Sequence, residues 1–196
     1  IRTRFGHGGP DRGAPVEERA KAWWYDEALG GGALLDFCCY GANLSRWFLG
    51  VSPVAVTGMA DRLVYGFGNV EDNAIVVVRY PNTICSFEAT WTQMAGDGVP
   101  GPVVFGSEAT LMVGSQDGKE GVLVKRSNED VQFVPADQLP EGHGNGPQHL
   151  IHCLQTGEAL FEPVTPELNL DVMAILEAGE KSAKSGRTIQ LPGAGE

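Results

Sequence analysis

The chain has 196 residues, of which 42% are hydrophobic and 20% charged, and this composition favours one folded domain over a disordered polymer or two domains. Its 14 basic and 25 acidic residues give a formal net charge of −11, which argues against a nucleic-acid partner because phosphates would be repelled. No apolar run approaches the roughly 20 residues of a membrane span, and the first residues do not form a signal peptide. We therefore expect a cytoplasmic protein without a membrane partner.

The beginning of the chain predicts a strand followed by two helices. Residues 1–5 alternate apolar and basic side chains and lead into the glycine-rich loop 6–10. Helical patterns follow at about residues 16–29 and 33–49, separated by three glycines at 30–32 and closed by Gly50. Since a chain rarely begins within a strand, we expect a preceding domain that these 196 residues do not include.

The middle of the chain predicts short strands separated by turns. The clearest is 83–92, where apolar and polar residues alternate as in a half-buried antiparallel strand. The other predicted strands are 54–59, 74–80, 103–105, 110–113, 122–125 and 131–134. This arrangement predicts a single α+β domain: a mainly antiparallel open sheet with helices on one face.

Two further helices are predicted near the end of the chain. The first covers residues 147–155 and ends at Gly157. The second has Thr165 as its N-cap and Pro166 at its first position, and it ends before Gly186. Its first turn is acidic and its last turns carry lysines, as the helix dipole favours.

The cysteines and histidines do not predict a metal site. Cys38, Cys39, Cys85 and Cys153 contain no Cys-x-x-Cys pair, which argues for burial as small apolar groups. His149 and His152 are three residues apart on a predicted helix, with no third ligand nearby in sequence. We therefore predict no metal.

The predicted helix 33–49 carries one polar stripe on a largely apolar surface. At 3.6 residues per turn, Asp36, Tyr40, Asn43 and Trp47 fall on one side. Buried polar groups need partners, so the stripe faces either another polar element or a cleft that holds ligand and water. The pattern alone leaves a structural Asp–Tyr hydrogen bond and a substrate cleft as alternatives.

The motif Gly-Gly-Gly-x-Leu-x-Asp-x-x-x-Tyr-x-x-Asn, with the Arg-aromatic pair and Leu-Gly that follow it, resembles the glucose–fructose oxidoreductase / inositol dehydrogenase (Gfo/Idh/MocA) family of two-domain nicotinamide enzymes. The likeness is to the C-terminal domain and covers nearly the whole chain, although only the helix motif is specific. Most relatives have histidine where this chain has Tyr40, and the tyrosine resembles the glucose–fructose oxidoreductase and dihydrodiol dehydrogenase branches. Cys38 replaces the usual glycine, and Asn43 stands where many relatives have aspartate.

The resemblance implies oxidation of a sugar or cyclic-polyol CH–OH group, or the reverse reduction, with NAD or NADP as cofactor. It assigns Tyr40 and Asp36 to catalysis, with Tyr40 as the acid/base, and Asn43 to substrate binding. A phenol with an ordinary pKa near 10 is a poor base at neutral pH, so a nearby cation is needed. The family supplies a lysine from a Glu-Lys-Pro motif in its nucleotide-binding domain.

Other candidate contacts lie on the predicted loops and at the cleft edge. Trp23, Trp24 and Tyr25 precede the glycine triplet, and aromatic faces stack on sugars. By analogy with relatives, Trp23 and Trp24 also approach the cofactor; core packing is the alternative for each ring. His7, in the loop after the first strand, is a candidate substrate contact.

Neither Glu-Lys-Pro nor a Gly-x-Gly-x-x-Gly fingerprint after a strand occurs in the sequence. We therefore expect the dinucleotide-binding domain to lie outside this chain, and the chain alone to be inactive. The alternative is a stand-alone carbohydrate-binding or dimerisation module without catalysis. Both readings predict a homodimer or tetramer, because the family pairs the open face of such a sheet with its copy in another subunit.

Overall fold

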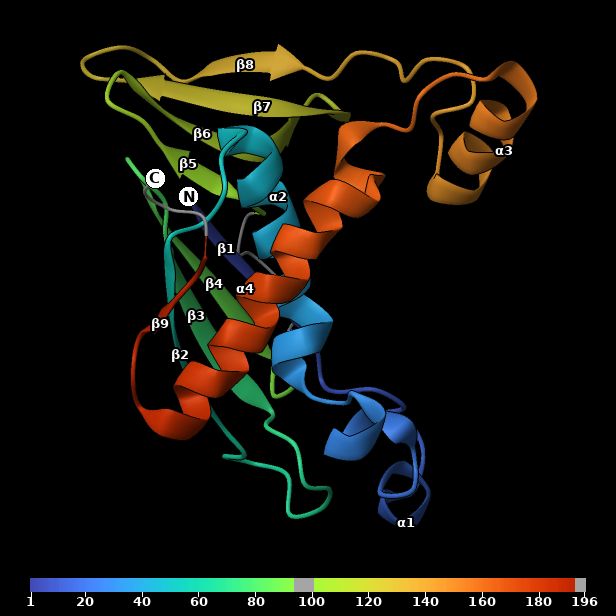
Figure 1. Cartoon of the computed structure of the whole chain (residues 1–196). Helices are drawn as coiled ribbons and strands as arrows, with labels where there is room; N and C mark the ends of the chain where they lie inside the picture. Colours follow the sequence, from blue (N-terminus) through green and yellow to red (C-terminus); the bar gives the residue numbers. More distant parts are fainter. Residues whose placement is uncertain (94–100, 193–196) are drawn as a thin grey trace.

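Figure 1 shows the computed structural model of the chain, which describes residues 1–93 and 101–192. Within these ranges nine strands form one sheet in the order β8-β7-β6-β5-β1-β4-β3-β2-β9. The strands are β1 (Arg2–Gly6), β2 (Ala55–Asp61), β3 (Asn73–Arg79), β4 (Ile84–Thr90), β5 (Val103–Phe105), β6 (Ala109–Gln116), β7 (Lys119–Arg126), β8 (Gln132–Pro135) and β9 (Ile189–Gln190). Strand β1 is parallel to β4, and the other described pairings are antiparallel. The predicted α+β class is confirmed.

The alternation along the central strands divides the sheet into a buried and an open face. In β4, Cys85 and Phe87 are fully buried, whereas Ile84 stays 66% exposed on the opposite side. Strand β3 repeats the pattern, with Val76 buried and Ile75 exposed. The buried face meets the helices, as expected for a sheet covered on one side.

Helices α2 (Cys39–Leu49) and α4 (Pro166–Ser185) pack side by side on the buried face. In Figure 1, α4 runs diagonally across β2 and β3 beside α2. A π-helical turn, Leu34–Cys38, precedes α2, so the predicted helix 33–49 exists but its first turn is wider than an α-helical turn. Helix α3 (Gly146–Thr156) lies apart from these two.

The predicted helix caps in the second half of the chain are confirmed. The Thr165 side chain accepts a hydrogen bond from the Leu168 amide, and Gly157 and Gly186 end α3 and α4 in left-handed conformations. The short strand β9 and the 3₁₀ turn Glu162–Val164 were not predicted from the sequence.

The prediction of one helix over residues 16–29 is wrong. The segment forms a single short turn, α1 (Val16–Arg19), and two 3₁₀ turns, Trp23–Tyr25 and Glu27–Leu29. Ala22 and Asp26 adopt extended backbone conformations that interrupt the helix. Tertiary contacts of Tyr25, which is only 2% exposed, override the local helix preference.

Candidate active site

Asp36 lies on the π-helical turn and is held from the sheet side. Its Oδ2 atom accepts a hydrogen bond of 2.8 Å from the indole Nε1 of Trp91, which is fully buried. The start of the turn is fixed separately, because Glu71 Oε1 accepts a hydrogen bond of 2.7 Å from the Leu34 amide. Asp36 keeps 19% of its side chain exposed, so the carboxylate is oriented by the core and still reachable.

His7 reaches the same carboxylate from the loop after β1. Its backbone amide donates to Thr90 O, extending the parallel pairing of β1 with β4. The imidazole Nε2 lies 3.9 Å from Asp36 Oδ2, and the ring makes an edge contact with Phe37 at a centroid distance of 5.0 Å. Segments distant in sequence thus bring His7 and Asp36 together.

Tyr40 follows one helical turn after Asp36. Its side chain is 52% exposed, and its ring packs against Phe5 at a centroid distance of 5.4 Å and against Phe37 at 6.4 Å. Partial burial and the neighbouring Cys39 and Asp36 raise the pKa of the phenol. Within this environment the protonated phenol is favoured, so a base at neutral pH needs a cation supplied from another source.

The other stripe residues face α4 and the segment before it. Asn43 Nδ2 donates to Pro163 O at 2.8 Å and to Asn169 Oδ1 at 3.3 Å, and so joins α2 to the start of α4. Trp47 packs edge-on against Phe161 at a centroid distance of 5.3 Å. The structure therefore brings His7, Asp36 and Tyr40 together, while the amide donors of Asn43 are used elsewhere.

Tyr25 belongs to the core. Its hydroxyl accepts a hydrogen bond of 2.6 Å from Arg19 Nη2 and donates one of 2.8 Å to Pro10 O. The Arg19 guanidinium also lies over the rings of Tyr25, Tyr65 and Phe67 at 4.8–5.4 Å. Tyr25 thus has neither exposed surface nor a free hydroxyl donor for a substrate.

The two tryptophans before Tyr25 stack on each other, with ring centroids 3.7 Å apart. Trp23 is 46% exposed, and Trp24 packs partly against the core. The carbonyl of Trp24 accepts a hydrogen bond from the Gly32 amide, which attaches this pair to the start of the π-helical turn. Trp23 is therefore the ring of the predicted aromatic group that is available for a ligand.

Trp91 and Arg19 are functional candidates that sequence reasoning missed. Trp91 was recognised only as the last apolar residue of an alternating strand, and its bond to Asp36 spans 55 residues. Arg19 lay within the predicted helix 16–29 and was not singled out, and it is 7% exposed. No local pattern signals either contact, because both depend on how the strand and loops meet.

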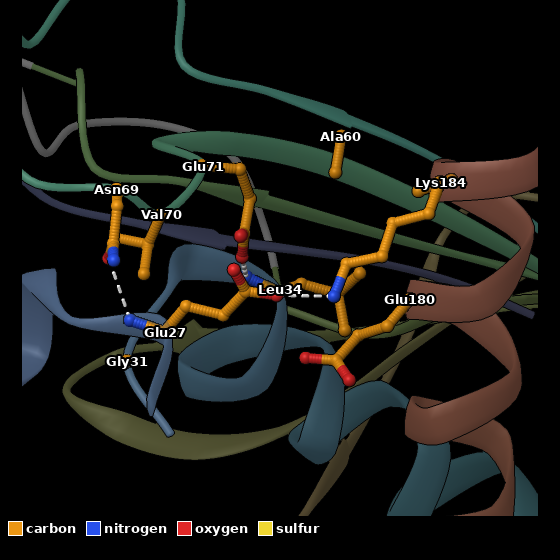
Figure 2. A pocket seen from close by; sticks show the side chains of 10 residues that line it. Glu27, Gly31, Leu34, Ala60, Asn69, Val70, Glu71, Glu180 and Lys184 are labelled. Atoms are coloured by element: carbon orange, nitrogen blue, oxygen red, sulfur yellow. Dashed lines mark hydrogen bonds and ion pairs between the residues drawn. The ribbon is translucent and has the colours of Figure 1, made fainter. Parts of the chain in front are cut away.

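A cavity of about 190 Å³ lies on the side of the π-helical turn that faces α4 (Figure 2). Figure 2 shows Glu180 and Lys184 reaching from α4, with Lys184 paired to Glu27. Burial raises the pKa of Glu71 and of Glu180. His7, Asp36 and Tyr40 do not line this cavity, so it is distinct from the group around Asp36.

In residues 1–93 and 101–192, no three His, Cys, Asp or Glu side chains are grouped closely enough to hold a metal ion. Across the same residues, no helix has the length and apolar character needed to cross a bilayer.

Comparison with known proteins shows the family to which the chain belongs. Residues 1–112 match the model of the GFO/IDH/MocA C-terminal domain. No curated protein matches the sequence. Three solved structures serve as examples of those with a similar fold. Aldose-aldose oxidoreductase from Caulobacter crescentus, complexed with glycerol, is 24% identical with a TM-score of 0.72, over 97% of this chain and 54% of that chain.

The second is an NAD-binding protein from Listeria innocua, which is 18% identical with a TM-score of 0.69, over 96% of this chain and 54% of that chain. The third is an oxidoreductase from Agrobacterium radiobacter in complex with NAD⁺, L-tartaric acid and magnesium. It is 18% identical with a TM-score of 0.66, over 97% of this chain and 56% of that chain. The chain thus spans about half the length of the structures that it resembles.

Proposed function

Because the chain belongs to the GFO/IDH/MocA family, with more than half of its residues matching the C-terminal domain of that family, we propose that it is the substrate-binding and catalytic half of an NAD(P)-dependent oxidoreductase. The reaction that we propose is oxidation of a CH–OH group of a sugar or polyol, or its reversal. The observation that carries the proposal is the half-exposed Tyr40 phenol, one turn after a carboxylate that Trp91 holds in place.

NAD or NADP, when bound, supplies the nicotinamide that accepts or returns the hydride. The sequence offers no glycine-rich phosphate loop between a strand and a helix, so we propose that a separate domain of the whole protein holds most of the dinucleotide. The stacked pair Trp23 and Trp24 is the feature of this chain that suits a flat aromatic ring, and Trp23 exposes the area for it.

Tyr40 is the proposed proton acceptor for the substrate hydroxyl. Its pKa is raised by burial and by Cys39 and Asp36, so proton acceptance requires an outside cation such as a lysine of the dinucleotide-binding domain. Asp36 accepts hydrogen bonds from substrate hydroxyls with its remaining lone pairs, since Trp91 uses only part of the capacity of Oδ2. Asn43, if it contacts substrate, does so through its carbonyl oxygen, because its amide group bonds Pro163 and Asn169.

Assembly through the open sheet face is part of the same proposal. Met59, Ile75 and Ile84 are 74%, 37% and 66% exposed on that face. Met59 and Ile75 are direct neighbours across β2 and β3, whereas Ile84 lies at the start of β4, opposite Arg79. Exposed apolar side chains on one sheet face are typical of a protein interface. We propose a homodimer or tetramer formed there, and Met59→Glu should weaken it, as sedimentation velocity would measure.

The test is Tyr40→Phe in this chain joined to its dinucleotide-binding domain, with turnover followed by nicotinamide absorbance over a series of polyols. Loss of an acid/base group lowers kcat by roughly 10²- to 10⁴-fold. Tyr80→Phe is the matched control, because it removes a hydroxyl that bonds Ser45, away from Asp36, on a residue that is only 1% exposed. Unchanged turnover in Tyr40→Phe, or polyol oxidation by the 196 residues alone, would contradict the proposal.

A further inference from the structure

We propose that His7 and Asp36 together bind a second hydroxyl of the substrate, so that the site selects diols over simple alcohols. The inference rests on the proposed function, in which the first hydroxyl of the substrate reacts and gives its proton to Tyr40. It adds a specificity-determining residue, His7, and names the groups that distinguish a polyol from a simple alcohol. Three observations support it: the hydrogen bond from the Gly9 amide to the His7 ring, the gap between the two side chains, and the contacts that anchor the loop.

The tautomer of His7 is set by its own loop. The Gly9 amide donates a hydrogen bond of 2.9 Å to Nδ1, so Nδ1 acts as an acceptor. In a neutral imidazole the proton must then lie on Nε2, which makes this atom a donor directed toward Asp36. Asp36 offers the opposite character, because an ionised carboxylate is an acceptor only.

The gap between the two groups has the size of one bridging oxygen. Nε2 and Oδ2 lie 3.9 Å apart, which is too long for a direct hydrogen bond. An oxygen atom at the usual distance of about 2.8 Å from each atom fits between them. A hydroxyl accepts from the Nε2 proton and donates to the carboxylate at the same time, whereas an ether or carbonyl oxygen can only accept.

The loop that carries His7 is anchored rather than loose. The Tyr65 hydroxyl lies within hydrogen-bonding distance of the carbonyls of Gly8 and Trp91 and shares its one proton between them. Gly9 has φ +82°, and a Cβ there would lie 2.6 Å from Tyr65 Oη and 2.9 Å from Arg19 Nη2. Only glycine fits this position without strain, and the amide that fixes the tautomer is therefore built into the fold.

We expect the bridging hydroxyl to lie near the reacting one. His7 and Tyr40 both contact the ring of Phe37, at centroid distances of 5.0 and 6.4 Å, so the two groups lie around one aromatic side chain. His7 and Tyr40 are both about half exposed and open to a ligand. A small diol can therefore present one hydroxyl to Tyr40 and another to the His7–Asp36 pair.

The first experiment reads the tautomer of His7 directly. Long-range ¹H–¹⁵N NMR of the histidine-labelled 196-residue chain at pH 8 should show His7 with its proton on Nε2. A His7 ring protonated on Nδ1 instead would overturn the proposal. This result does not depend on turnover or on a cofactor.

The second experiment uses the Trp91 indole N–H as a reporter, because this group is bonded to Asp36. The probes are glycerol and 2-propanol, which both have a secondary hydroxyl; glycerol has two neighbouring primary hydroxyls in addition, and 2-propanol has none. The indole signal should titrate with glycerol at a concentration about 5- to 10-fold lower than with 2-propanol, the ratio expected for one added hydrogen bond.

Two variants distinguish the effect of the N–H donor of His7 from the effect of the size of its side chain. His7→Gln retains an N–H donor near the position of Nε2 and should keep the preference for glycerol, whereas His7→Leu should abolish it. Equal preference in wild type and His7→Leu, or no preference in wild type, would overturn the role of His7. The proposed function fails separately, through unchanged turnover in Tyr40→Phe.

Discussion

At Gly41 the helix that carries Tyr40 lies very close to the sheet. A Cβ built on Gly41 would lie 2.4 Å from Phe87 Cδ1 and 2.4 Å from Thr3 Oγ1. Phe87 is fully buried and Thr3 is 1% exposed, so neither neighbour can move into solvent. Gly41→Ala should therefore push α2 away from β1 and β4.

Two opposing terms set the size of the effect. Alanine is favoured over glycine inside a helix by about 1 kcal/mol, which stabilises the variant. Forcing a methyl group into a well-packed core costs about 1–3 kcal/mol. Both contacts are about an ångström shorter than ordinary van der Waals distances, so the cost lies at the upper end, and we expect a net loss of about 1–2 kcal/mol.

Urea unfolding followed by tryptophan fluorescence measures this loss. With an m-value of about 2–3 kcal/mol/M, the midpoint should fall by roughly 0.3–1 M. Gly146→Ala is the matched control, because a Cβ at this helical position meets nothing within 4 Å, and its midpoint should be unchanged or slightly higher. If Gly41→Ala were as stable as the wild type, the close contact between α2 and the sheet would be refuted.

Three further predictions follow from the pKa shifts. Burial raises the pKa of the Cys38 thiol, so iodoacetamide at pH 8 should leave Cys38 unmodified in the native chain and modify it in urea, as peptide mass spectrometry would show. Burial raises the pKa of Glu71 above 4.5, so the stability that the protonated side chain contributes is complete below pH 4.5 and is lost as the pH rises through the folded-state pKa. Glu71→Gln should therefore gain stability relative to wild type between pH 4 and 7, as urea titrations would measure. A difference in unfolding free energy between the two proteins that stays constant over this range would contradict this. The hydrogen bond from His152 lowers the pKa of Glu158 below 4.5, so the stability that the ionised carboxylate contributes is present above pH 4.5 and is lost as the pH falls through the folded-state pKa. Carboxyl NMR should place the pKa of Glu158 closer to 4.5 in His152→Gln.

The sheet was largely predictable because its strands alternate in sequence. Residues 83–92 contain β4, and the predicted alternation is the one that the structure shows, with Cys85 and Phe87 buried and Ile84 exposed. The caps of α4 were predictable for the same local reason, since Thr165 and Gly186 act on neighbouring backbone groups. Elements whose structure is determined by residues close together in the chain can be recognised from a single sequence.

The parts that could not be predicted depend on contacts distant in the chain. The segment 16–29 has helix-forming residues, yet Tyr25 turns inward to meet Arg19 and Pro10. Asn43 lies on the predicted stripe, but its amide bonds Pro163 and Asn169, more than a hundred residues away.

The position of β1 has a consequence for how the molecule folds. The first strand lies between β4 and β5, and thus joins two antiparallel meanders, β2-β3-β4 and β5-β6-β7-β8, each of which consists of sequential neighbours. The meanders can form early by local hairpin closure. Pairing β1 with β4 closes a loop of about eighty residues, and because this costs more chain entropy it happens late in folding. His7 follows β1 directly, so the hydroxyl-binding pair is completed only in this last step, and partly folded chains would contain both meanders without a competent site.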